Sequence, residues 1–184
     1  MALRVTSVLM EMARHALASY GDDLLPRALL STALYNRGVV LGKLGHDDEA
    51  LPLYGEVIAQ PVDDPAPIIE AQIAKALVNK ANILRRRGDD NMAFDLYCRA
   101  VECSTNAGAD MFLFEEPVAN AVAALAQVAS IDEHRAEAMY VRVIASGDLR
   151  AMAPTQPGSD SRGRRGLSAC HGQWPCASGR ESNP

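Results

Sequence analysis

The chain has 184 residues, of which 48% are hydrophobic and 5% aromatic, and its formal net charge is −5. This hydrophobic share is enough for a packed core, and abundant Ala and Leu with few aromatic residues favour helices over sheets. Residues 151–184 carry a balance of +2, so residues 1–150 carry −7. An acidic body argues against a nucleic-acid groove, which needs a basic stripe.

Apolar residues at spacings of three and four predict a first helix over residues 3–19. Its apolar stripe consists of Val5, Val8, Leu9, Met12 and Ala16. Glu11 and Arg14 interrupt the run, which is therefore too short and too polar for a signal peptide or a membrane span.

The next two helices have clear boundaries. Pro26 suits the first turn of a helix, where its missing N–H costs nothing, and Gly45 ends that helix. Asp47 or Asp48 is expected to cap the following helix, which extends to about Ile58. A loop with three prolines comes after it.

The same order of elements then occurs again. A long helix is predicted over residues 68–87, Gly88 ends it, and Asp89 or Asp90 is expected to cap a helix over residues 92–104.

A third copy is weaker. A helix is predicted over residues 118–130, Ile131 stands in the place of the terminating glycines, and Asp132 is expected to cap a last helix that ends near Ser146. Beyond it Pro, Gly, Ser and Arg dominate, so we expect residues 151–184 to be a disordered tail.

Three columns of matching residues recur every 43 positions. They are Gly38, Ala81 and Ala124; Ala50, Ala93 and Ala136; and Tyr54, Tyr97 and Tyr140. A fixed period of this size indicates a stack of similar units. Because small residues let helix backbones approach, we expect Gly38 to face Ala50, and Ala81 to face Ala93. The tyrosines are expected to fill the space between one unit and the next.

These units resemble tetratricopeptide repeats (TPRs). The two full copies read Leu34-x2-Arg37-Gly38-x2-Leu41, then Gly45, then Ala50-x3-Tyr54; and Leu77-x2-Lys80-Ala81-x2-Leu84, then Gly88, then Ala93-x3-Tyr97. Arg37 and Lys80 depart from the family pattern, which has an apolar residue there. The usual repeat has about 34 residues, so the resemblance is to the long-repeat variants of the family.

The resemblance implies an all-α, right-handed solenoid of antiparallel helix pairs within a domain of residues 1–150. Its repeats cover about residues 26–60, 68–104 and 112–146, preceded by the helix at 3–19. Each unit of a solenoid contacts only its neighbours, so the two ends need caps. The first helix is expected to cap one end, and no segment is evident for the other, so the chain is expected to be a fragment of a longer array.

The resemblance also implies an inner groove lined by the first helix of each unit. The groove positions are Tyr35, Asn36 and Val39 in the first copy, and Lys75, Asn79, Asn82 and Arg86 in the second. Asn offers a donor and an acceptor, and Lys or Arg supplies charge, for a bound peptide. The predicted partner-binding residues are Tyr35, Asn36, Lys75, Asn79, Asn82 and Arg86.

Simpler interpretations of the same residues stay open. Asn36 and Asn79 are expected to face the same way, and they could equally hydrogen-bond the backbone between helices. Val78 stands where a carboxylate clamp of the family has a Lys, so a dedicated clamp is not expected. The Arg85-Arg86-Arg87 run is interpreted as a solvated helix end, because three successive helical residues splay around the axis.

The predicted function is therefore protein–protein interaction, in which the concave groove receives a peptide or helix of a partner protein. The alternative is a regulatory or sensory segment of a larger bacterial transcription regulator or signalling ATPase. No catalytic set, metal-ligand spacing or cofactor motif is visible, so no enzyme activity, metal or cofactor is expected. Four cysteines without a disulfide framework point to a cytoplasmic protein.

Overall fold

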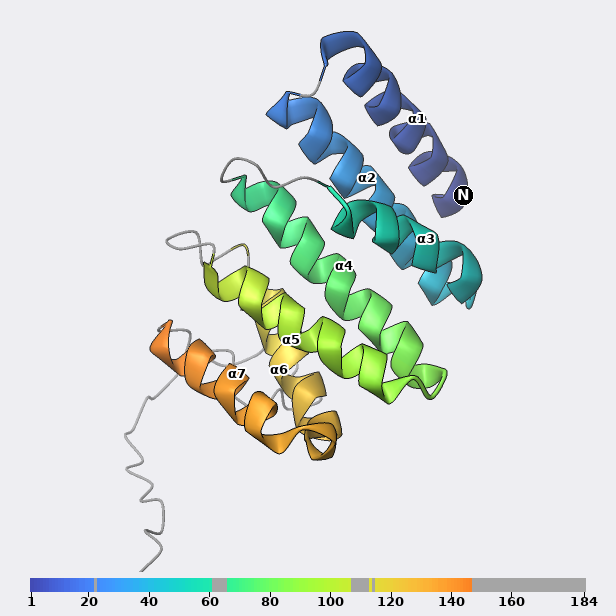
Figure 1. Ribbon diagram of the computed structural model, residues 1–184. Coiled ribbons are helices and arrows are strands. Elements are labelled where there is room, and N and C mark those ends of the chain that lie inside the picture. The colour runs from blue at the N-terminus through green and yellow to red at the C-terminus, as the bar shows by residue number, and fades with distance from the viewer. Residues whose placement is uncertain (22, 61–65, 107–112, 114, 147–184) are drawn as a thin grey trace, which may run out of the picture. The chain divides into compact units, whose positions relative to one another are not determined.

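Figure 1 shows the computed structural model, which describes residues 1–21, 23–60, 66–106, 113 and 115–146. The chain divides into two units, Met1–Pro154 and Thr155–Pro184, and every described residue belongs to the first. The predicted disordered tail at residues 151–184 lies outside the described residues. Within them the secondary structure is helical with no strand, which confirms the all-α prediction.

The helices that the structure describes in the first unit, together with the 3-10 turn η2, follow one another along the chain. They are α1 (Ala2–Tyr20), α2 (Leu24–Lys43), α3 (Asp47–Ile58), α4 (Pro67–Arg86), α5 (Asp90–Asn106), α6 (Glu115–Val128), η2 (Ala129–Ile131) and α7 (Glu133–Ala145). Each of the helices expected from the sequence is present, with ends within a few residues of the expected ones.

The 43-residue period of the sequence is also the period of the helices except α6, which begins at Glu115, 48 residues after the start of α4. Helices α2 and α4 begin 43 residues apart and end 43 residues apart, at Lys43 and Arg86. Helices α3, α5 and α7 begin at Asp47, Asp90 and Glu133, again 43 residues apart. We call α2, α4 and α6 the leading helices, and α3, α5 and α7 the trailing helices.

Each helix packs against the next one in the chain, and the leading helices also pack against one another. Helix α2 contacts α1, α3 and α4, while α4 contacts α2, α3, α5 and α6 (Figure 1). The core lies between the leading and trailing helices and contains fully buried side chains such as Leu34, Leu77 and Tyr97.

The first two turns between leading and trailing helices are built on glycine. Gly45 and Gly88 have φ angles of 80° and 86°, a region that side chains disfavour. In both turns the residue after the glycine donates its N–H to a carbonyl of the ending helix, His46 to Leu41 and Asp89 to Leu84, each at 3.0 Å. This is the hydrogen bond of a Schellman cap.

The third turn lacks the glycine and is built differently. Ile131 ends the 3-10 turn η2, so the chain leaves α6 without a left-handed residue. Asp132 accepts a hydrogen bond from the Arg135 backbone N–H at 2.9 Å, which confirms the predicted cap of α7.

The capping role predicted for Asp47 or Asp48 is wrong. The residue at the cap position of α3 is His46, and both aspartates lie inside the first turn. Their carboxylates instead contact the end of α4: Asp47 binds Arg86 at 2.9 Å, and Asp48 binds Arg87 at 2.7 Å. The pairs were not visible in the sequence because their members are 39 residues apart.

Gly38, the first member of the small-residue column at 38, 81 and 124, leaves space for the aromatic ring of Tyr54. A Cβ atom added to Gly38 would lie 2.7 Å from Cε1 of Tyr54, which is closer than real Cβ contacts. Gly38 therefore meets Tyr54, one turn beyond the Ala50 that was expected to face it. Ala50, Ala81 and Ala93 are fully buried, as packing positions should be.

The apolar stripe predicted on the first helix is present on α1 but faces outward. Thr6 and Ala13 are the buried residues of α1, whereas Val5 and Met12 expose 53% and 63% of their surface. The helix therefore lacks the polar outer face that a terminal cap of a repeat stack requires. Its predicted role as a cap is not supported by this orientation.

None of the helices in the described part of the chain combines the length and apolar content that crossing a bilayer requires.

Candidate partner-binding site

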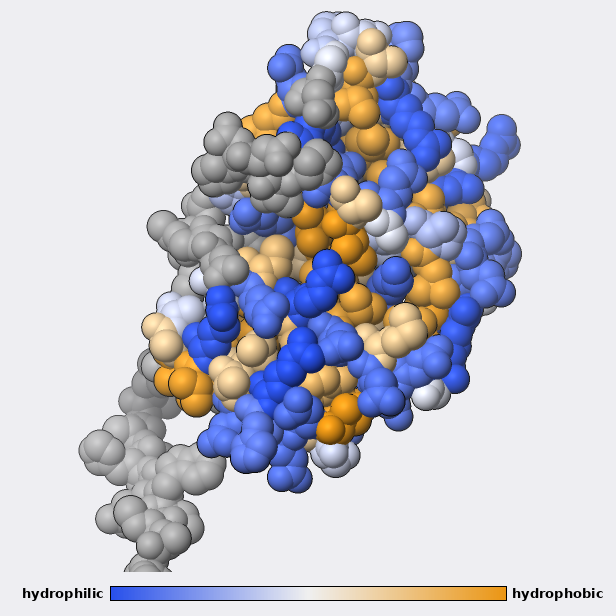
Figure 2. All heavy atoms as spheres, in the orientation of Figure 1, coloured by the Kyte–Doolittle hydropathy of each residue, from blue (hydrophilic) through white to orange (hydrophobic). Residues whose placement is uncertain are grey.

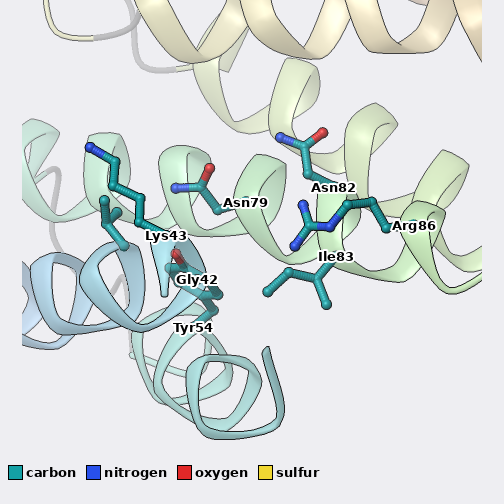
Figure 3. Close-up of a pocket in the computed structure, with 8 residues that line it drawn as sticks. Gly42, Lys43, Tyr54, Asn79, Asn82, Ile83 and Arg86 are labelled. Atoms are coloured by element: carbon teal, nitrogen blue, oxygen red, sulfur yellow. The ribbon is translucent and has the colours of Figure 1, made fainter. Parts of the chain in front are cut away.

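A pocket of about 210 Å³ lies between the leading helices α2 and α4, above a side chain of α3. Figure 3 shows how side chains of the three helices meet there. The lining residues are Val39, Gly42 and Lys43 of α2, Tyr54 of α3, and Asn79, Asn82, Ile83 and Arg86 of α4.

Helical spacing explains why these residues share one opening. Asn79, Asn82 and Arg86 follow one another at intervals of three and four, so they lie on one face of α4. Val39 and Lys43 are related in the same way on α2. Lys43 and Val39 also stand one period before Arg86 and Asn82, so the repeat brings equivalent positions of two helices to one pocket.

Tyr54 forms the apolar floor of the pocket. Its ring lies against Gly38 and within 6.2 Å of the Tyr35 ring, centroid to centroid, at an interplanar angle of 51°. Burial is the main cause that raises the pKa of the Tyr54 phenol above its ordinary value. The phenol is therefore uncharged at neutral pH, and the charges at this pocket come from its basic residues and from Asp47.

Two amide side chains supply the polar groups. Asn79 Nδ2 donates a hydrogen bond to the Tyr35 hydroxyl at 3.2 Å, and the Tyr97 hydroxyl donates to Asn82 Oδ1 at 2.6 Å. These bonds use one donor of Asn79 and the acceptor of Asn82. The Asn79 carbonyl and the Asn82 amino group keep hydrogen-bonding capacity for a ligand.

Two basic residues give the pocket its charge. Arg86 Nη2 lies 2.9 Å from both carboxylate oxygens of Asp47, so its charge is balanced. Lys43 is exposed, and the ion pairs of the described residues do not include it. The pocket therefore has one uncompensated positive charge on a body whose residues are acidic overall.

The structure brings only part of the predicted set together. Asn79, Asn82 and Arg86 line the pocket, and Tyr35 lies next to it through its bond with Asn79. Asn36 lies in a different groove, between α1 and α2, and Lys75 is a half-buried residue of α4 that is not part of the pocket lining.

Four lining residues, Gly42, Lys43, Tyr54 and Ile83, were missed in the sequence. Lys43 could have been found, because it stands one period before Arg86. Tyr54 was assigned to packing between units, and it does pack there, but its ring is also the pocket floor. Asn79 donates a hydrogen bond to the Tyr35 hydroxyl and not to the backbone between helices. The simpler interpretation was therefore right that Asn79 makes a structural hydrogen bond, and wrong about the group that accepts it.

The interpretation of Arg85-Arg86-Arg87 as a solvated helix end holds for exposure, since Arg86 and Arg87 are exposed at the end of α4, but it leaves out the partners of these side chains. The three side chains splay as expected, but each finds a partner: Arg85 contacts Gln127 of α6, while Arg86 and Arg87 pair with acidic residues of α3. The run therefore connects α4 to the helices on both sides of it.

No group of three His, Cys, Asp or Glu side chains in the described part of the chain is arranged to hold a metal ion. The pocket offers hydrogen-bonding groups, the ammonium group of Lys43 and apolar walls. No family model, no curated protein and no solved structure matches the chain.

Proposed function

We propose that residues 1–146 form a TPR-like solenoid module that binds a segment of a partner protein in the groove between the leading helices. The observation that carries this proposal is that three residues selected from the family's groove pattern, Asn79, Asn82 and Arg86, meet at one pocket with Lys43. Helices that recur every 43 residues and pack in chain order support the solenoid arrangement.

The size and chemistry of the pocket favour part of a peptide over a small molecule. A volume of about 210 Å³ is below the roughly 300–1,000 Å³ of typical ligand pockets. It accommodates one aliphatic side chain between Val39, Ile83 and the Tyr54 ring. A peptide bond above that side chain can receive a hydrogen bond from Asn82 and give one to Asn79, and Lys43 favours an acidic residue nearby.

Lys43 provides the cleanest test of this proposal. Alanine at Asn79 or Asn82 would also remove an internal hydrogen bond, whereas Lys43 is an exposed residue outside the internal ion pairs. The full chain would be used to select peptides from a displayed library, and the affinity of a selected peptide would be measured by fluorescence anisotropy.

We expect Lys43→Glu to weaken that peptide by about tenfold, because one attraction becomes a repulsion. Arg99→Glu, at an exposed position of α5, makes the same change in net charge and should leave the affinity unchanged. Equal affinities for the two variants would remove the pocket from the proposal.

A further inference from the structure

The end of the unit formed by α1 and α2 has a second, more apolar groove of about 290 Å³. We call it the end groove. Its lining residues are Leu9, Met12, Ala13 and Ala16 of α1, and Leu29, Thr32, Ala33 and Asn36 of α2. Leu9, Met12 and Leu29 expose 46%, 63% and 49% of their surface. Figure 2 shows hydrophobic residues at the surface over this end of the unit.

The repeat itself shows what covers a groove of this kind. The trailing helix α3 and the leading helix α4 contact each other, and α2 packs across both. In the next repeat α4 packs across α5 and α6 in the same way. Helix α1 precedes α2 as α3 precedes α4, so the end groove corresponds to grooves that a leading helix covers elsewhere.

Single residues support this correspondence. Asn36 and Asn79 are 43 residues apart, and Asn79 reaches back to Tyr35 on the helix that covers its own groove. Asn36 lines the end groove at the same position of its helix. It therefore presents an amide where a covering helix would present a hydroxyl or carbonyl acceptor.

The exposed stripe of α1 has the spacing of a buried one. Val5, Leu9 and Met12 are related by steps of four and three, as are Ala50, Tyr54 and Val57, the residues on the buried face of α3. On that face, the ring of Tyr54 packs against Gly38 of α2. The α1 stripe is therefore a face suited to packing, and two of its residues, Leu9 and Met12, line the end groove.

We propose that the end groove binds one amphipathic helix of a partner protein, lying where a leading helix lies in the other repeats. The partner helix supplies aliphatic side chains at positions i, i+4 and i+7 to Leu9, Met12 and Leu29, and a hydrogen-bond acceptor to Asn36. The occupant continues an interface that already exists between the repeats. This surface is separate from the pocket between α2 and α4.

A synthetic peptide with the sequence of residues 24–43 is the probe. In the intact chain this helix covers the α3–α4 groove, and it carries Tyr35, which accepts the bond from Asn79. Fluorescein-labelled peptide would be titrated with the full chain, and binding followed by anisotropy. We expect saturable binding that Met12→Glu weakens at least tenfold, since a carboxylate would be buried against the peptide.

The controls separate the end groove from other surfaces. Val141→Glu places the same charge on α7, at a residue that is 58% exposed, and should leave the affinity unchanged. Lys43→Glu should also leave it unchanged, which keeps this result independent of the pocket between α2 and α4. Circular dichroism melts of Met12→Glu and the parent chain should coincide, because the substituted side chain is exposed.

Three outcomes would overturn the proposal. They are no saturable binding, binding that Met12→Glu and Val141→Glu reduce equally, and self-association of the chain that Met12→Glu abolishes in sedimentation velocity. The last outcome would assign the end groove to a second copy of the chain.

Discussion

Helices α4 and α1 have nearly the same length, 20 and 19 residues, but very different surroundings. Helix α4 has ten buried residues and packs against four other helices, whereas α1 has two buried residues and packs mainly on α2. Both carry apolar residues at helical spacing. Burial in this stack is therefore decided by the number of neighbours as much as by the residues of the helix.

The comparison also shows what an apolar stripe means. On α4 such a stripe is covered within the chain, while on α1 Val5, Leu9 and Met12 are exposed. Helical spacing identifies a face suited to packing, but it does not identify the neighbour that packs there. In a stack of repeats the two ends are the places where these statements differ.

The largest expected effect separates the two helices by a matched substitution. Leu77→Ala on α4 removes a side chain that is 1% exposed and should lower the free energy of unfolding by about 2–5 kcal/mol. Leu9→Ala on α1, where 46% of the leucine is exposed, should cost about 0.5 kcal/mol. Urea denaturation followed by circular dichroism measures both. Similar losses would mean that the Leu9 face of α1 is covered.

The second effect is a pH dependence of stability that comes from a buried thiol. Burial raises the pKa of the Cys98 thiol from 9.0 to about 11. Below about pH 9 the thiol is protonated in the folded and unfolded chains, so its contribution is fully present. As the pH rises further, the unfolded chain loses its proton first, and stability should fall by about 2 kcal/mol up to pH 11.

Cys98→Ala tests this origin of the pH dependence. The variant should show a shallower fall in urea midpoint between about pH 8 and pH 11 than the parent chain. Some fall should remain, because burial also raises the pKa of Cys103 and of Tyr54 and Tyr97. Identical pH profiles for the two chains would show that Cys98 ionises as easily in the folded state as in the unfolded one.

The smallest effect compares two equivalent asparagines. Asn79→Ala removes the hydrogen bond to the Tyr35 hydroxyl and should destabilise the fold by about 1 kcal/mol. Asn36→Ala changes an exposed residue at the same position of the preceding leading helix and should change stability by less than about 0.5 kcal/mol. Thermal melts of the two variants provide the measurement. A larger loss of stability for Asn36→Ala than for Asn79→Ala would show that the Asn36 side chain makes stabilising contacts within the chain.

The features that sequence predicted best were local ones. Gly45 and Gly88 marked the ends of α2 and α4 because a left-handed residue at a helix end favours glycine. Residue spacing within each helix, and the 43-residue period, were also readable from single segments. The third turn was harder to define, since Ile131 lies in a 3-10 turn that has no comparable residue signature.

Contacts between distant residues were beyond the same reasoning. Aspartate at a helix start suits a cap and an ion pair equally well, so Asp47 and Asp48 were assigned to caps although they bind arginines of α4. The Tyr54 ring contacts Gly38, which has no side chain, only when α2 and α3 pack against each other. The family's groove pattern therefore selected part of the pocket lining, and helix packing determined which of the selected residues came together.

Trailing helices that begin 43 residues apart, at Asp47, Asp90 and Glu133, make the chain divisible. The stretch 47–89 starts with one trailing helix and ends just before the next, so a tandem duplication joins Asp89 to Asp47, which begins a trailing helix as Asp90 does. A gene with that insertion would encode a longer protein with one additional trailing helix and one additional leading helix. Recombination between copies could lengthen or shorten such a gene without disturbing any helix boundary.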